Sequence, residues 1–210
     1  MSSWRRKLNE SLVQGMRQKV LLLVGEGNFS FALDLASRRP RNIEKLVASS
    51  IQTEADVLSM YPAARSTLGK LRQIPWVCLE FGVDATNYEH LLRVIDSQDV
   101  LVVWNFPSAA EVTYGRHREN HQLMHDFLDA IANCSLNQCV LRNMELWITL
   151  FGPQWGAWQL EKVCTQRGFT GVGSLSFDPL EFPIYSRTFR AKCIPKAKQC
   201  CATYILQALN

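Results

Sequence analysis

Hydrophobic residues gather in short runs along this chain, and stretches with helical spacing separate the runs. The strand-like runs cover residues 20–24, 46–51, 76–81, 100–104, 146–150, 171–177 and 202–206. The helix-like stretches cover residues 29–38, 54–60, 87–95, 118–132 and 155–166. Strands that alternate with helices are typical of βαβ units around a parallel sheet.

The end of the chain departs from this alternation. The runs 171–177 and 202–206 are joined by a proline-containing loop without a helical pattern, so we expect them to form an antiparallel hairpin. The pattern therefore predicts an α/β, Rossmann-like fold whose seven-stranded sheet is mostly parallel, with helices on both faces. We expect residues 19–210 to form one domain, preceded by a basic extension of residues 1–18, because 210 residues would be cramped for two domains.

Composition narrows the class of protein. Hydrophobic residues make up 47% and charged residues 20%, as in ordinary globular domains. No apolar run approaches the roughly 18 residues that span a bilayer, so we expect no membrane segment. The seven cysteines are odd in number and have no CxxC spacing, which favours thiols in a reducing compartment over disulfides or a zinc site.

Positive charge is uneven along the chain. The net charge is +4, and basic residues gather near both ends of the chain. Near the start they are Arg5, Arg6, Lys7, Arg17 and Lys19, and near the end Lys192, Lys196 and Lys198. Such clusters favour contact with nucleic acid phosphates. Solvent-exposed surface is the equal alternative. An amphipathic mitochondrial presequence at residues 1–20 is the less favoured interpretation, because Glu10 and the short length argue against it.

The sharpest local signal is the loop Gly25-Glu26-Gly27-Asn28, which follows a buried strand and opens a helix. Its two glycines let the backbone turn tightly and approach a ligand. The helix that follows offers unpaired N–H groups, and Asn28 can cap it. The third glycine of a dinucleotide fingerprint and the Gly-Lys-Ser/Thr ending of a P-loop are missing. A purely structural turn is the alternative.

Two further loops follow the carboxyl ends of strands, where open α/β sheets bind ligands. Asp84, in the loop of residues 82–86, can accept a hydrogen bond from an adenine amino group; alternatively it caps the next helix. Asn105-Phe106-Pro107 follows the fourth strand. Its amide can bind a base edge and its aromatic ring can stack on the base. A strand that simply ends at a proline is the alternative.

Three histidines are spaced four residues apart and would share one helix face: His117, His121 and His125. No HExxH pattern or nearby cysteine accompanies them, so surface histidines are favoured over a metal site. Arg118 and Asn120 can reach the candidate site from the start of this helix.

The ten residues Leu22 to Phe31, LLVGEGNFSF, resemble the opening signature of the large-subunit rRNA uridine-N3 methyltransferase family. The same domain begins the ferredoxin-fold anticodon-binding-domain-containing proteins. The resemblance continues through ordered motifs over residues 48–54, 60–64, 82–86, 105–107, 147–150, 177–179, 182–185 and 203–204. It covers nearly the whole chain, from about residue 19 to residue 206.

This resemblance implies an S-adenosylmethionine-dependent methyltransferase that acts on N3 of uridine in rRNA. The implied partners are RNA and pre-ribosomal particles, and we expect a metal-free monomer in the nucleolus or nucleus, with the cytoplasm or mitochondrion as the alternative. The residues that the resemblance places around the cofactor are Gly25, Glu26, Gly27, Asn28, Phe29, Ser30, Asp84 and Ala85. Asn105, Phe106 and Pro107 would face the target base.

The chain departs from the family pattern on the acceptor side. Ser108-Ala109-Ala110 stand where relatives have a histidine and a nearby glycine, and residues 182–185 read Phe-Pro-Ile-Tyr where relatives read Tyr-Pro-Gly-Tyr. Strand two leads to Glu54 only after five uncharged residues, so the ribose contact is open. The alternative function is therefore a catalytically silent RNA-binding or ribosome-assembly factor with the same fold.

Overall fold

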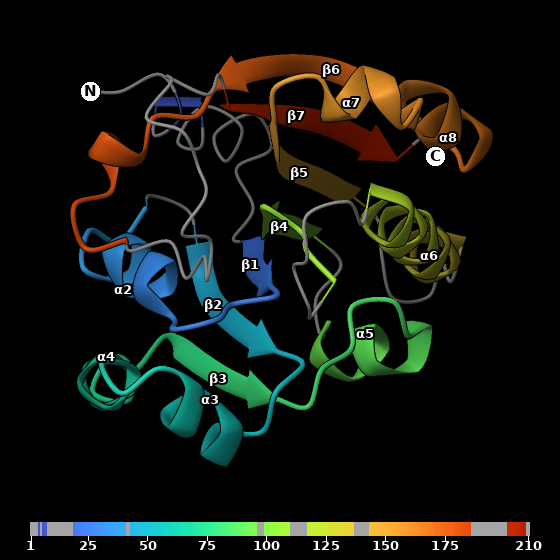
Figure 1. Ribbon diagram of the computed structural model, residues 1–210. Coiled ribbons are helices and arrows are strands. Elements are labelled where there is room, and N and C mark those ends of the chain that lie inside the picture. Colours follow the sequence, from blue (N-terminus) through green and yellow to red (C-terminus); the bar gives the residue numbers. More distant parts are fainter. Residues whose placement is uncertain are drawn as a thin grey trace.

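The computed structural model describes residues 4, 6–7, 19–40, 43–95, 99–109, 117–136, 143–185 and 201–208. Seven strands in this part of the chain form a sheet (Figure 1). The strands are β1 (Lys19–Val24), β2 (Ile43–Ser50), β3 (Val77–Phe81), β4 (Asp99–Asn105), β5 (Asn143–Phe151), β6 (Phe169–Ser176) and β7 (Cys201–Ala208). The helices are α2 (Ser30–Ala36), α3 (Glu54–Met60), α4 (Ala64–Leu71), α5 (Tyr88–Val94), α6 (His117–Leu136), α7 (Gln154–Ala157) and α8 (Leu160–Gln166), with a short 3-10 turn η1 (Pro179–Glu181).

The strand order is β3-β2-β1-β4-β5-β7-β6, which confirms the predicted fold class. The first five strands along the chain run parallel, and β7 lies antiparallel between β5 and β6. The chain order reverses between β1 and β4. At such a switch point, the connections leave the two strand ends in opposite directions and open a crevice for a ligand.

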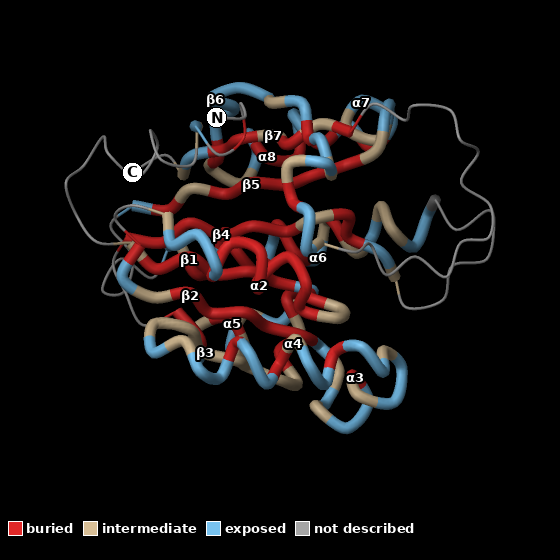
Figure 2. Tube along the Cα trace, turned by 90° about the vertical axis from the view of Figure 1, so that its left-hand side faces the viewer, coloured by how far each residue is buried: buried red, intermediate tan, exposed pale blue. Residues whose placement is uncertain are grey.

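Helices cover both faces of the sheet. Figure 1 shows α2, α3 and α4 on one side and α5, α6 and α8 on the other. Successive strand residues point to opposite faces of the sheet. Leu21 and Leu23 therefore belong to the core under α2 and α4, while Leu22 and Val24 belong to the core under α5, α6 and α8. Figure 2 shows β1, β2, β4 and β5 as a buried inner layer, with exposed outer surfaces on α3 and α4, whereas every residue of α2 is buried. Within the described residues, no helix has the length and hydrophobicity needed to cross a membrane.

Several predicted helix bounds differ from the observed ones, two of them because of a left-handed residue, and one helix was missed. The missed helix is α4, although Ala64, Leu68 and Leu71 are buried at helical spacing. The helix predicted over residues 155–166 is broken into α7 and α8, because Gln159 adopts a left-handed conformation with φ 51°. The helix predicted from Phe29 begins at Ser30 for the same reason, since Phe29 has φ 59°.

Trp4 is fully buried although it precedes the first strand by many residues. Its indole packs edge-on against Trp147 of β5, with ring centroids 4.8 Å apart, and against Phe182, at 5.2 Å. Phe31 of α2 and Phe177 complete this aromatic cluster. The cluster ties the beginning of the chain to the α2 side of the sheet.

Candidate active site

The GEGN loop, residues 25–28, passes directly over the indole of Trp104 on the neighbouring strand. Val24 and Trp104 are paired in the β1–β4 ladder, so the loop begins where the two strands lie side by side. Gly25 has φ 70°, and a Cβ placed there would come within 2.4 Å of Trp104 Nε1. Any side chain at this position would therefore be strained and would clash, which explains the glycine.

Glu26 is the buried acid of this loop. Its side chain is 9% exposed, and Oε2 accepts a hydrogen bond from the Ala32 N–H at 3.3 Å, inside the first turn of α2. Its own N–H donates to the Ser49 carbonyl at 2.8 Å and so joins the loop to the end of β2. Burial raises the pKa of the Glu26 carboxyl to about 7, while the bond from Ala32 partly offsets that rise.

The start of α2 presents backbone groups to the crevice and sends its aromatic ring inward. Asn28 Oδ1 accepts from the Ser30 N–H at 3.1 Å, so this side chain satisfies the first helical amide although it lies one residue before the cap position. The Phe29 ring is fully buried and contacts Phe81 of β3, with centroids 5.4 Å apart. Phe29 could therefore contact a cofactor through its backbone but not through its ring. Gly27 is half-buried.

The loops after β2 and β3 are held together by two backbone hydrogen bonds. Gly82 N donates to the Gln52 carbonyl at 3.2 Å, and Val83 N donates to the Ser50 carbonyl at 2.9 Å. These bonds bracket Ile51, whose side chain is 56% exposed. An exposed apolar side chain at a sheet's carboxyl edge offers a planar ligand a surface to pack on.

Asp84 stands next to this apolar surface. Its Oδ1 accepts from both the N–H and the hydroxyl of Thr86, at 2.9 and 2.7 Å. The cap of α5 is instead Asn87, which accepts from Glu89 and His90, so the helix-cap alternative for Asp84 is wrong. Asp84 Oδ2 accepts no hydrogen bond from the residues that the structure describes, which leaves it available to an amino group. Ala85 is buried beneath the loop.

The end of β2 presents Gln52, at the place where the sequence left the ribose contact open. Glu54 is ion-paired with Arg72 of α4 at 2.6 Å, on the outer side of α3. Ser50 Oγ donates to Gln52 Oε1 at 2.6 Å, which orients the Gln52 amide nitrogen as a donor. Sequence reasoning looked for a carboxylate here and therefore missed Gln52.

Asn105 carries the most unusual polar group of the site. Thr149 of β5 donates its hydroxyl proton to Asn105 Oδ1 at 2.6 Å. The other end of the amide, Nδ2, is buried and has no hydrogen-bond partner among the described residues. A buried donor without a partner costs about 1–3 kcal/mol, so an orphaned Nδ2 at the carboxyl end of β4 indicates a place for an external acceptor.

Phe106 does not offer a face for stacking in this conformation. Its backbone is left-handed, with φ 55°, and its ring is 8% exposed. The ring packs against Phe151 and Phe177, with centroids 4.5 and 5.4 Å away. The predicted stacking of this ring on a base thus has no support in the geometry, because the turn after β4 directs the ring into the core. Pro107 is buried as well.

The start of α6 holds the loop that follows Pro107. Asn120 Oδ1 accepts from the Ala109 N–H at 2.8 Å, in agreement with the expectation that Asn120 reaches this region. His121 and His125, by contrast, contact each other, with 2.9 Å between their Nε2 atoms. Burial lowers the pKa of His125, and the charges of His121 and Arg167 lower it further. No group of three metal-ligating side chains occurs among the described residues.

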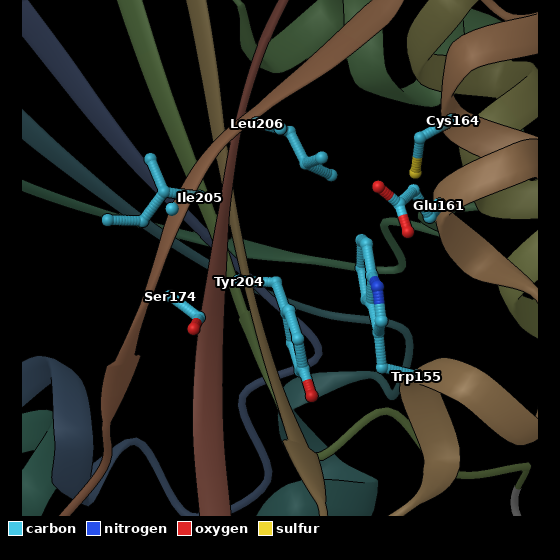
Figure 3. Close-up of a pocket in the computed structure, with 9 residues that line it drawn as sticks. Trp155, Glu161, Cys164, Ser174, Tyr204, Ile205 and Leu206 are labelled. Carbon is cyan, nitrogen blue, oxygen red and sulfur yellow. The ribbon is translucent and has the colours of Figure 1, made fainter.

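A separate pocket of about 240 Å³ lies at the other side of the sheet, between β6–β7 and α7–α8 (Figure 3). Trp155 and Tyr204 stack at its wall, with centroids 4.1 Å apart and planes 8° from parallel. Burial raises the pKa of the Cys164 thiol to about 12, so this sulfur remains protonated at neutral pH. The pocket includes neither the GEGN loop nor Asn105.

Of the basic residues predicted to contact phosphate, only Arg6, Lys7 and Lys19 lie within the described residues, and Arg17 lies outside them. Lys19 is ion-paired with Glu145, with 3.9 Å between Nζ and Oε2. Arg6 is exposed and Lys7 is half-buried. Arg5, Lys192, Lys196 and Lys198 lie outside the described part, as does Ala110 of the acceptor loop. The RNA-binding surface therefore stays a prediction.

Solved methyltransferase structures share this fold. The chain superposes on a 16S rRNA (adenine(1408)-N(1))-methyltransferase of Catenulisporales acidiphilia, solved as a point mutant with its cosubstrate SAM, with a TM-score of 0.57 at 13% identity over 98% of this chain and 92% of that one. An antibiotic-related methyltransferase gives a TM-score of 0.56 at 11% identity, over 99% and 94% of the two chains. These identities establish the fold alone.

Sequence relatives point the same way. The chain is 29% identical over 206 residues to the ferredoxin-fold anticodon-binding domain-containing protein 1 homolog of Mus musculus, and 26% identical over 172 residues to heavy metal-associated isoprenylated plant protein 41 of Arabidopsis thaliana. These matches cover 90% and 79% of this chain but only 31% and 32% of the relatives, so the chain spans about a third of their length. Residues 22–188 match the BMT5-like family profile, described as rRNA (uridine-N3-)-methyltransferase.

Proposed function

The chain belongs to the BMT5-like rRNA (uridine-N3-)-methyltransferase family, and from this premise we propose that it methylates N3 of a uridine in RNA. The fold and the family together imply binding of S-adenosylmethionine. The observation that carries the proposal is the buried Asn105 Nδ2 without a hydrogen-bond partner among the described residues. It lies at the end of β4, beside the strand that leads into the GEGN loop, where an external acceptor could bind it.

The residues at the crevice fit this cofactor. Gly25 lets the backbone cross the Trp104 indole, where a Cβ would not fit, and the amides of Gly27 to Ser30 follow directly. Glu26 would pair with the ammonium group of the methionine moiety, since a buried carboxylate needs a cation to stay charged. Asp84 Oδ2 and Ile51 would hold the adenine by its amino group and its face, and Gln52 would donate to the ribose.

Bound S-adenosylmethionine supplies an electrophilic methyl group on a sulfonium. The protein must hold N3 of the base in line with that methyl and must stabilise the base as it gives its N3 proton to solvent water. Residues 105–109 contain no carboxylate. Their contribution is therefore the Asn105 Nδ2–H donor, which can bind a ring carbonyl on which negative charge develops during proton loss.

The experiment is transfer of labelled methyl to total RNA from cells that lack the protein, followed by nucleoside analysis for 3-methyluridine. Asn105→Ala should keep cofactor affinity within about twofold and lower transfer at least about tenfold, which corresponds to roughly 1.4 kcal/mol of transition-state stabilisation. Equal rates in variant and wild type would remove Asn105 from the mechanism.

A wild-type protein that binds cofactor in calorimetry yet methylates no RNA would contradict the enzymatic function. The silent RNA-binding or ribosome-assembly role would then take its place. The expected rRNA partner, monomeric state and nucleolar or nuclear location, with the cytoplasm or mitochondrion as the alternative, are implied by the family resemblance and stay predictions.

A further inference from the structure

Four side chains, three of them fully buried, form one row of hydrogen bonds that ends at Asn105. Trp4 Nε1 donates to Thr203 Oγ1 at 3.0 Å, Thr203 Oγ1 and Thr149 Oγ1 are 2.8 Å apart, and Thr149 donates to Asn105 Oδ1 at 2.6 Å. Trp4, Thr149 and Thr203 are fully buried. The row is therefore closed to water along most of its length.

The sheet register creates this row. Asn105 of β4 is directly opposite Thr149 of β5, and Thr149 is directly opposite Thr203 of β7. Residues opposite each other on neighbouring strands project from the same face. The row thus crosses three strands in a straight line, and Trp4 closes it from the aromatic cluster on that face.

Trp4 fixes the direction of the row, because an indole N–H can only donate. Thr203 Oγ1 accepts the hydrogen bond from Trp4 and donates one to Thr149, and the Thr149 hydroxyl donates in turn to Asn105 Oδ1. The reverse arrangement would have Asn105 Nδ2 donate to Thr149 and Thr149 donate to Thr203. The hydroxyl proton of Thr203 would then have no acceptor among the described residues, at a fully buried site.

We propose that Trp4 is a positioning residue of the acceptor site, which acts through Thr203 and Thr149 to turn the Asn105 amide so that its NH2 group faces the target base. This inference rests on the proposed RNA methylation. Trp4 and Thr203 both lie outside residues 22–188, the part that matches the family profile. The hydrogen-bond row therefore depends on segments of this chain beyond that match.

The fixed orientation selects the base. In uracil, N3 is flanked by two carbonyl oxygens, which accept the Asn105 N–H. In cytosine one of these positions carries an amino group, and two donors would face each other without a bond between them. A site whose buried donor must find an acceptor discriminates strongly against a base that lacks it. The orientation of Asn105 therefore favours uridine over cytidine where its N–H meets the C4 position, because the C2 carbonyl is common to both bases.

The test compares Trp4→Phe, which keeps an aromatic ring in the cluster and removes only the N–H, with wild type. We expect cofactor affinity within about twofold, a kcat for 3-methyluridine formation about tenfold lower, and a KM for RNA that changes little. Thr203→Val should reproduce this effect, and Thr203→Ser, which restores the hydroxyl, should recover most of the rate. Total RNA from cells that lack the protein serves as the substrate, and labelled 3-methylcytidine is measured alongside.

Trp147→Phe is the matched control. Trp147 is equally buried in the same cluster, but its indole donates to Glu145 at 2.6 Å and takes no part in the row. This variant should lower the melting temperature as Trp4→Phe does while leaving kcat unchanged. Equal loss of kcat in both variants would show that Trp4 contributes only through packing in the aromatic cluster, and would overturn the inference.

A double-mutant cycle gives the sharpest readout. If Trp4 acts through Asn105, then Trp4→Phe should have no further effect on transfer in the Asn105→Ala background, whereas independent effects would multiply. Multiplied effects overturn the inference even though the proposed function stands. A wild-type protein that transfers no methyl group overturns both, and that outcome is distinct because it is seen before any variant is made.

Discussion

The cofactor half and the acceptor half of the crevice are assembled over very different distances along the chain. On the cofactor side, side chains bond to groups two to six residues away, as in Asn28 with Ser30, Asp84 with Thr86 and Glu26 with Ala32. On the acceptor side, Asn105 bonds Thr149 across 44 residues, and Trp4 bonds Thr203 across 199.

This difference bears on how each half responds to change. The proposed cofactor half is a set of tight loops shaped by local side-chain bonds and joined to one another by backbone hydrogen bonds such as those from Glu26 to Ser49 and from Val83 to Ser50. A substitution there is therefore expected to act on cofactor affinity directly. The acceptor half depends on which strands become neighbours, so a remote substitution can alter it without touching the crevice. Four variants of the cofactor half test whether its contacts are as local as the structure indicates.

The largest effect is expected from Gly25→Ala. Its Cβ would clash with Trp104 Nε1 in a left-handed conformation, which should lower the free energy of unfolding by about 2–5 kcal/mol and abolish cofactor binding. Urea unfolding and calorimetry with S-adenosylmethionine measure both quantities. Gly69→Ala in α4 is the control, because nothing lies within 4 Å of its added Cβ and the unfolding free energy should stay equal or rise. Wild-type affinity in Gly25→Ala would remove this loop from the cofactor site.

Glu26→Gln should change how stability depends on pH. The folded pKa of about 7 lies above the ordinary value of 4.5, so between these values only the folded state keeps the proton. The contribution of Glu26 to stability is therefore full below about pH 4.5, falls as the pH rises to 7, and ends roughly 3 kcal/mol lower. Urea unfolding at pH 5 and pH 8 should show this slope in wild type and a flatter one in Glu26→Gln.

The same variant tests the ammonium contact. Cofactor affinity should strengthen as the pH of the wild-type solution rises through 7 and the carboxylate becomes charged, and Glu26→Gln should lack this rise. A variant with the same pH dependence as wild type would show that another group controls it.

Asp84→Ala should weaken S-adenosylmethionine binding by roughly 1–3 kcal/mol while leaving stability nearly unchanged. The helix cap belongs to Asn87, so Asn87→Ala should do the opposite and lower the unfolding free energy by about 0.5–2 kcal/mol with cofactor affinity retained. Calorimetry and thermal melting of both variants give the comparison. Matching losses of stability in the two variants would contradict the division of roles.

The smallest effect is expected from Glu54→Gln. The Glu54–Arg72 pair is partly exposed, so its loss should change the unfolding free energy by less than about 1 kcal/mol and leave cofactor affinity unchanged. Gln52→Ala, two residues earlier, should weaken the cofactor. A larger loss of cofactor affinity in Glu54→Gln than in Gln52→Ala would assign the ribose contact to Glu54 and extend the proposed cofactor half to α3.

The sequence by itself determined the fold class and located the loops that we propose for the crevice. Alternating strand and helix patterns predicted the mostly parallel sheet, and the Gly25 turn, the Asp84 loop and the Asn105 strand end were all found by local signals. These features depend on the backbone preferences and the hydrophobic period of a few consecutive residues. Even the errors are local: left-handed residues at Phe29 and Gln159 moved or divided helices whose apolar spacing was correct.

Only the tertiary structure decided the acceptor half. The left-handed turn at Phe106 sent a ring expected at the base into the core, and burial of Trp4 turned a residue of a basic segment into part of the aromatic cluster. The row through Thr149 and Thr203 exists because β7 inserts between β5 and β6 in one register. That register minimises the free energy of the whole sheet, and no window of neighbouring residues contains it.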